Sequence, residues 1–231
     1  MIRAGVIAAS TLLLAAAFTT RASDRRSTCH ATLVPAYLGP DGLSRLAAHA
    51  PLHWSLVVNP HNGPGAAQDE RYRDAIAAAR AAGARVLGYV ATAWGARPAA
   101  AVQTEVERYL AWYDVDGIFL DEAAADKAAL PHYRELAAGA RAAGAAAIAI
   151  NPGMVPARGY FDIADIVVTF EGPFAAYSDR REPRWLARVE SHRIAHLVYD
   201  APRATARGRV YMTPGEPPNP WATVPLPAEA C

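Results

Sequence analysis

The sequence contains little cysteine and has almost no net charge. Its 231 residues include two cysteines, too few for a disulfide-rich scaffold or a zinc site built from thiolates. The 23 basic and 22 acidic residues leave a formal charge of +1, so the basic excess typical of nucleic-acid-binding proteins is missing. We therefore expect no nucleic-acid partner.

Several short catalytic motifs are also missing from the sequence. It has neither the Gly-x-Ser-x-Gly turn of many serine hydrolases nor a phosphate-binding P-loop. Its seven histidines form no His-x-His or His-Glu-x-x-His pattern. We expect no metal and no cofactor. A metal-dependent hydrolase using Asp121 or Glu122 remains an alternative.

The composition is that of a globular domain. Hydrophobic residues make up 52% of the chain and charged residues 19%, which is enough apolar surface to offset the entropy of ordering. No linker of low complexity divides the chain after its first segment. We therefore expect one domain over residues 29–231, and a monomer.

The N-terminal segment has the pattern of a secretory signal peptide. Arg3 precedes an apolar stretch from Ala4 to Phe18, and small residues follow it. The stretch is shorter than the about 20 apolar residues that span a bilayer. We predict a signal peptide over residues 1–22, cleaved near Ala22, with an uncleaved anchor as the alternative. The mature protein is then secreted or held at the cell surface or in the periplasm, without stable membrane insertion.

The two cysteines lie at the ends of the expected mature chain. Export leads to an oxidising compartment, where paired cysteines persist. A Cys29–Cys231 disulfide would close almost the whole domain into one loop, which loop-entropy arguments value at about 4–5 kcal/mol. We predict this disulfide. The alternative is two unpaired thiols.

Short apolar runs alternate with helical patterns along the chain. Buried parallel strands are typically continuous runs of aliphatic residues, and eight runs fit. The expected strands are 32–37, 54–58, 85–90, 117–120, 147–150, 166–170, 194–198 and 209–212. Helices are expected over 42–50, 68–82, 99–112 and 127–143, with a helical segment near 183–189. The pattern predicts an α/β fold, a compact (β/α)8 TIM barrel. A doubly wound open sheet is the alternative, but the turn after the first strand lacks its glycine-rich motif.

Three carboxylates follow two of these strands. Asp121 and Glu122 come directly after an apolar run, and Glu171 ends another strand. Ionised carboxylates at buried strand ends are costly unless they are paired or used. Two acids that converge at a barrel mouth are the minimum for glycoside hydrolysis. Helix caps and ion pairs also place acids after strands.

Other strand ends carry aromatic or amide side chains, which suit a sugar-binding groove. Flat rings can stack on sugar faces, although each ring can equally pack beneath a loop. The two asparagines precede prolines and can instead shape loops. The candidate substrate-binding residues are Tyr37, Asn59, Tyr89, Trp94, Asn151 and Tyr199.

A set of ordered motifs resembles one known family. The motifs are Val57–Gly65, Val86–Thr92, Asp116–Glu122, Asn151–Gly153 and Thr169–Glu171, followed by Ala195–Tyr199 and Asn219–Trp221. This set is similar to the spherulation-specific family 4 (spherulin-4-like) proteins from Leu33 to Trp221.

The resemblance implies a compact (β/α)8 glycoside hydrolase. Relatives of this kind are endo-acting hydrolases of α-1,4-linked N-acetylgalactosamine or galactosamine in secreted microbial polysaccharides. The acidic residues of the family motifs correspond to Asp121, Glu122 and Glu171 here.

Strand-end placement and resemblance together give one hypothesis. The chain is expected to be a secreted endo-glycosidase of an amino-sugar polysaccharide. Asp121 is the expected nucleophile, Glu171 the acid/base, and Glu122 holds a sugar hydroxyl or tunes its neighbour. We expect retention, which requires carboxyl groups about 5–5.5 Å apart, whereas inversion needs about 6.5–9.5 Å. The alternative is a carbohydrate-binding or wall-associated barrel without turnover, since fold does not fix function.

Overall fold

The computed structural model of the chain describes residues 32–49 and 54–224. The predicted signal peptide, its cleavage site and both cysteines lie outside these residues, so these expectations stay predictions. Within the described ranges, no helix combines the length and the apolar character needed to cross a membrane.

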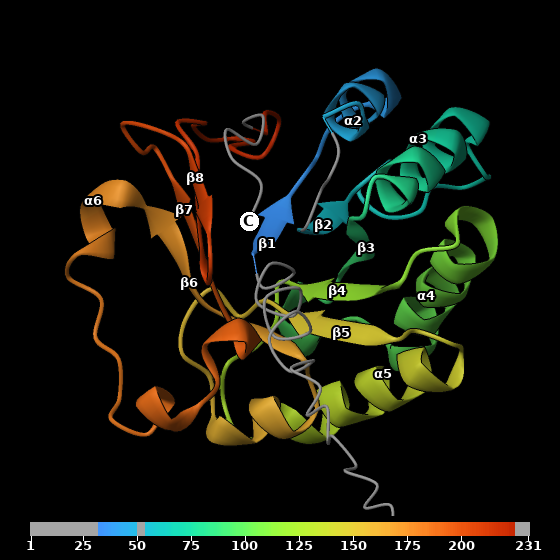
Figure 1. The fold of residues 1–231 in the computed structure, drawn as a ribbon. Helices are drawn as coiled ribbons and strands as arrows, with labels where there is room; N and C mark the ends of the chain where they lie inside the picture. The colour runs from blue at the N-terminus through green and yellow to red at the C-terminus, as the bar shows by residue number, and fades with distance from the viewer. Residues whose placement is uncertain (1–31, 50–53, 225–231) are drawn as a thin grey trace, which may run out of the picture.

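One sheet of nine strands forms the centre of the fold (Figure 1). The strands are β1 (Leu33–Pro35), β2 (Ser55–Val58), β3 (Arg85–Ala91), β4 (Gly117–Asp121), β5 (Ala147–Ile150), β6 (Ile166–Pro173), β7 (Ile194–Tyr199), β8 (Thr205–Arg207) and β9 (Val210–Met212). Strands β1 to β7 follow one another in the sheet, β9 pairs with β7, and all these pairs are parallel. This sequential order is that of a barrel and not that of a doubly wound sheet.

The sheet curls until its first and last parallel strands meet. The Thr32 hydroxyl donates a hydrogen bond to the Gly208 carbonyl at 2.8 Å, and β1 lies next to β9. The Tyr37 N–H donates to the Trp221 carbonyl at 3.1 Å, which joins the segment after β9 to the end of β1. The predicted α/β barrel is confirmed as a single, nearly closed barrel, and its eight parallel strands are those expected from the sequence.

Strand β8 was not expected from the sequence. It pairs antiparallel with β9, with Thr205 opposite Met212 and Arg207 opposite Val210. Gly208, at φ +56°, begins the two-residue turn between them. The sequence 205–207 is short and only partly buried, so it lacks the apolar run from which the other strands were predicted.

Four longer helices cover the outside of the first half of the barrel (Figure 1). They are α2 (Pro40–Ala47), α3 (Glu70–Ala81), α4 (Ala99–Tyr113) and α5 (Leu130–Ala142), and each lies within a few residues of its predicted range. Up to residue 224, where the described part of the chain ends, the second half carries only η2 (Arg158–Asp162), α6 (Phe174–Tyr177), η3 (Leu186–Arg188) and η4 (Ser191–Arg193). The helical segment expected near 183–189 is wrong except for the single 3-10 turn η3. Three residues are too few for an α-helical turn to propagate.

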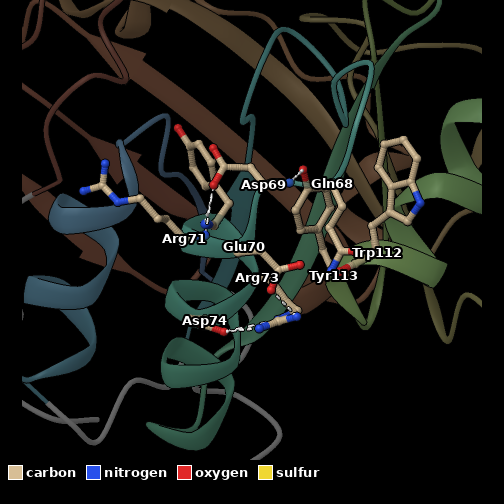
Figure 2. A network of polar contacts seen from close by, with 9 residues as sticks. Gln68, Asp69, Glu70, Arg71, Arg73, Asp74, Trp112 and Tyr113 are labelled. Atoms are coloured by element: carbon tan, nitrogen blue, oxygen red, sulfur yellow. Dashed lines mark hydrogen bonds and ion pairs between the residues drawn. The ribbon is translucent and has the colours of Figure 1, made fainter.

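Hydrogen bonds made by the residues just before helix α3 attach this helix to the end of α4 (Figure 2). The Asp69 side chain caps α3 by accepting hydrogen bonds from the backbone N–H groups of Arg71 and Tyr72. The Gln68 amide donates to the Trp112 carbonyl at 3.1 Å, and the Asp69 N–H donates to the Tyr113 hydroxyl at 3.2 Å. The start of α3 is therefore attached to the end of α4 on the outside of the barrel.

Helix α4 packs closely on β3 because Gly88 has no side chain. A Cβ at Gly88 would lie 2.5 Å from the Tyr109 ring, which is closer than real Cβ contacts. Buried aliphatic residues of β2 to β5 fill the space around this contact. The packing leaves the carboxyl ends of these strands as the rigid edge that carries the candidate site.

Candidate active site

Asp121, Asn151 and Glu171 meet at the carboxyl ends of three neighbouring strands. Asp121 ends β4, Asn151 directly follows β5, and Glu171 lies in β6. The Asn151 Nδ2 group donates one hydrogen bond to Asp121 Oδ1 at 2.7 Å and another to Glu171 Oε2. Because one nitrogen reaches both carboxylates, their nearest oxygens lie within two hydrogen-bond lengths, at most about 6 Å.

The orientation of the Asn151 amide is fixed by its other contacts. Its Oδ1 accepts the Gly153 N–H at 2.9 Å, so the Nδ2 end faces the two acids. Its own N–H donates to the Leu120 carbonyl at 2.9 Å. With only 5% of its surface exposed, Asn151 is held rigidly. Asn151 therefore shapes its loop, as the alternative for this residue expected, and it also bridges the two acids.

Asp121 is partly buried and accepts several hydrogen bonds. Burial is the largest influence and raises the pKa of Asp121. Hydrogen bonds from the Glu122 N–H, the Asn151 amide and the Tyr89 hydroxyl oppose this rise by stabilising the ionised form. Asp121 thus has the donors that a buried carboxylate needs to keep its charge.

Glu171 is the more strongly perturbed acid. Burial, followed by the charge of Asp121, raises its pKa from 4.5 to about 7. Hydrogen bonds from the side chains of Asn151 and Trp221 reduce the rise without cancelling it. When the environments of two close carboxyl groups separate their pKa values in this way, one group can act as a proton donor and the other as its anionic partner.

Glu122 differs from the other two acids in its backbone and its contacts. Its φ of +50° is rare for a residue that is not glycine, and its N–H is turned toward the Asp121 carboxylate. Its own carboxylate forms no hydrogen bond or ion pair with the residues that the structure describes, and it is partly exposed. Glu122 is therefore available to a ligand beside Asp121.

Two predicted tyrosines lie next to the acid pair. Tyr89 donates its hydroxyl hydrogen bond to Asp121, and its ring contacts Tyr37 edge-on at 5.6 Å between centroids. Burial raises the pKa of the Tyr37 phenol well above its usual value, and the nearby charge of Asp121 adds to the rise. Both phenols therefore keep their protons and can act as hydrogen-bond donors.

Tyr199 and Trp221 lie on the β7 side of the site. Tyr199, at the end of β7, contacts the Trp221 ring at 6.2 Å. The Trp221 side chain, whose only donor is the indole N–H, forms a hydrogen bond to Glu171. Trp221 belongs to the motif Asn219–Trp221, from which no role was predicted for it. It lies well beyond β9, so the strand-end rule could not find it.

Trp94 is the most exposed of the large hydrophobic residues, with 68% of its surface accessible. It lies in the turn η1 (Ala93–Gly95) after β3, where Ala93, Trp94 and Gly95 all have positive φ. Its N–H donates to the Glu122 carbonyl at 2.6 Å, which places the turn beside the acids. Strained backbone of this kind persists only where its surroundings hold it.

Two further apolar side chains are exposed after neighbouring strands. Met154 follows β5 and is 59% exposed, and Phe174 follows β6 and is 41% exposed. Trp94 follows β3, so the three exposed apolar side chains come from the segments after β3, β5 and β6, at the same end of the barrel as Asp121 and Glu171.

Asn59 has a structural role in the loop after β2. Its Oδ1 accepts the Gly63 N–H at 2.8 Å, which closes the turn. No hydrogen bond joins its side chain to the acid pair, so the structure does not bring it together with the other candidates. Across 32–49 and 54–224 there is also no group of three or more His, Cys, Asp or Glu side chains that could hold a metal ion.

The fold and this edge define the class of protein as a (β/α)8-type barrel with two bridged, partly buried carboxylates at the carboxyl ends of its strands. The model of spherulation-specific family 4 matches residues 31–213, so the chain belongs to this family. This confirms the resemblance inferred from the motifs.

Two relatives were found by comparison of sequence and of structure. Spherulin-4 from Physarum polycephalum is 32% identical over 146 residues, which cover 60% of this chain and 44% of spherulin-4. The match thus spans less than half of that protein. The crystal structure of Aspergillus clavatus Sph3 in complex with GalNAc superposes with a TM-score of 0.70 and 23% identity, covering 83% of this chain and 91% of that one. This likeness supports the barrel fold.

Proposed function

We propose that the protein is a secreted endo-glycosidase that hydrolyses α-1,4-linked N-acetylgalactosamine or galactosamine in a polysaccharide. The observation that carries this proposal is the bridge from Asn151 to Asp121 and Glu171, together with the raised pKa of Glu171. A close, partly buried acid–carboxylate pair is the arrangement that glycoside hydrolysis requires.

In the first step Asp121 attacks the anomeric carbon of the sugar. Glu171, protonated because its pKa is raised, gives its proton to the glycosidic oxygen as the bond to the leaving sugar breaks. A covalent glycosyl ester on Asp121 results. The donors on Asp121, from Asn151, Tyr89 and the Glu122 N–H, keep this carboxylate ionised before attack.

In the second step Glu171 acts as a base. It takes a proton from a water molecule, whose oxygen attacks the anomeric carbon and releases Asp121. Two inversions give net retention. The shared Asn151 nitrogen limits the nearest carboxylate oxygens to at most about 6 Å, which supports retention because inverting pairs are usually about 6.5–9.5 Å apart.

The substrate class rests on the family and on the rim of the site. The fold relative Sph3 was crystallised with GalNAc. In this chain Tyr37 and Tyr89 lie beside the acids, and Tyr199 contacts the Trp221 ring. Exposed Trp94 follows β3 and exposed Phe174 follows β6, and both rings are proposed to stack on sugars of the bound chain. Several stacking positions along a bound chain favour cleavage within it. Glu122 is proposed to hold a hydroxyl group of a bound sugar.

The test is digestion of α-1,4-linked galactosaminoglycan, in acetylated and partly deacetylated forms, by the mature protein from about Ser23. Asp121→Asn and Glu171→Gln are run alongside, with Glu135→Gln on the exposed face of α5 as the matched control. Mass spectrometry should detect oligosaccharides from the wild type and the control, and none from the site variants. Binding without products would favour a carbohydrate-binding barrel, and full activity in the site variants would end the proposal.

A further inference from the structure

A buried threonine connects the acid-bearing strand end to the turn that displays Trp94. Thr92 directly follows β3 and is fully buried. Its hydroxyl lies 2.8 Å from the Asp121 carbonyl, 2.8 Å from the Glu122 carbonyl and 2.8 Å from the Tyr133 hydroxyl. Its backbone N–H also donates to the Asp121 carbonyl, at 2.9 Å.

The direction of these hydrogen bonds follows from the number of protons. The Thr92 hydroxyl has one proton, and the two carbonyls facing it can only accept. Its contact with Tyr133 must therefore have Tyr133 as the donor. The Tyr133 oxygen in turn accepts the Ala124 N–H at 2.9 Å. A series of hydrogen bonds thus runs, from donor to acceptor, from Tyr133 in α5 through Thr92 to the carbonyls of Asp121 and Glu122.

This series of hydrogen bonds holds three residues in backbone conformations that would otherwise relax. Glu122 has a φ of +50°, and Ala93 and Trp94 have φ of +47° and +53°. Such backbone is strained and persists only when its surroundings impose it. The Glu122 carbonyl accepts both the Thr92 hydroxyl and the Trp94 N–H, so a single acceptor ties the acid turn to the Trp94 turn.

The backbone of Thr92 completes the connection. Its carbonyl accepts the Gly95 N–H at 3.0 Å and the Arg97 N–H at 3.2 Å, so both ends of the η1 turn depend on this residue. Thr92 touches neither carboxylate itself. Any effect on catalysis passes through the backbone of Asp121, Glu122 and Trp94.

We propose that Thr92, supported by Tyr133, is a positioning residue. It holds the acid pair and the exposed Trp94 ring in fixed positions relative to each other. The proposal rests on the proposed function for its catalytic consequence. Because small displacements of a catalytic group can cost about 100-fold in rate, loss of this hydroxyl should lower turnover and not only stability.

The test compares Thr92→Val, which has nearly the same shape without the hydroxyl, with Thr92→Ser, which keeps the hydroxyl. We expect kcat on galactosaminoglycan to fall about 10- to 100-fold in Thr92→Val and to stay within about 3-fold in Thr92→Ser. Tyr133→Phe removes only the outer member of the chain and should fall between them. A Thr92→Val protein that is folded and has wild-type kcat and KM would overturn the proposal.

Hydrogen exchange provides a readout that does not need activity. The Trp94 and Gly95 amides should exchange at least about 10-fold faster in Thr92→Val than in the wild type and Thr92→Ser, while the amides of β2 and β5 stay unchanged. Unchanged exchange at Trp94 and Gly95 would refute the positioning role. If exchange changes as expected but the wild type cleaves no galactosaminoglycan, the positioning role stands and the proposed function fails.

Discussion

Replacing Glu171 by glutamine should make the protein more stable at neutral pH and leave its stability less changed in acid. Folding moves this carboxyl into a buried position beside Asp121, which raises its pKa from 4.5 to about 7. The folded state therefore holds the proton more tightly than the unfolded chain. The stabilisation that protonated Glu171 gives the folded state is fully present below a pH of about 4.5. It is lost as the pH rises through about 7.

The size of the effect follows from the shift. One pKa unit corresponds to 1.36 kcal/mol, so a rise of about two and a half units costs about 3 kcal/mol once the group is ionised. A glutamine keeps the shape and one acceptor oxygen but carries no charge. The free energy of unfolding of Glu171→Gln, relative to the wild type, should therefore be about 3 kcal/mol higher at pH 8 than at pH 4.

Urea denaturation of both proteins at several pH values between 4 and 8.5 measures this difference. Glu135→Gln, on the exposed face of α5, controls for the chemical change and should follow the wild type. In an Asp121→Asn background the pH-dependent gain should shrink, because the charge of Asp121 is the second cause of the shift. A difference between Glu171→Gln and wild type that stays constant within about 0.5 kcal/mol across this range would refute the reasoning.

Three further outcomes are expected on galactosaminoglycan. The value of kcat/KM should fall above a pH of about 7, where Glu171 loses its proton, and should also fall in acid, where Asp121 gains one. A flat profile of kcat/KM from pH 5 to 9 would contradict the assigned roles. Asn151→Ala removes the donor shared by both acids, so the pKa of Glu171 should rise further, which moves the alkaline limb of the same profile upward, and kcat should drop about 10- to 1,000-fold. Trp94→Ala should raise KM for long chains several-fold with an unchanged melting temperature, because the ring is exposed; equal loss on all chain lengths, or a lowered melting temperature, would argue against a sugar-stacking role.

The sequence predicted the centre of the site because that centre is built from consecutive strands. In a parallel barrel, neighbouring strands in the chain are neighbours in space, so polar residues at the ends of β4, β5 and β6 had to meet. Asp121, Asn151 and Glu171 could be placed together on this rule alone. Asn59 followed the same rule and was not joined to them, because its side chain closes its own loop.

The parts that could not be predicted depend on contacts between distant segments. The hydrogen bond from Trp221 to Glu171 comes from a segment after the last strand, whose path no periodicity describes. Thr92 and Tyr133 meet only because α5 packs against the end of β3, and a threonine after a strand carries no signal of its own. The short helices after β5 and the strand β8 were missed or wrongly predicted for a related reason. These elements have few residues and are partly buried, so their sequences show little hydrophobic periodicity.

The most direct test of the two-carboxylate account is the anomeric configuration of the first product. The mature protein would be mixed with an α-1,4-linked galactosamine oligosaccharide, and the anomeric protons of the new reducing end followed by NMR before mutarotation. Because Asp121 and Glu171 share one amide donor, the account predicts retention, with the α-anomer formed first. A β-anomer formed first would contradict it, as would an α-anomer formed at the same rate by Glu171→Gln.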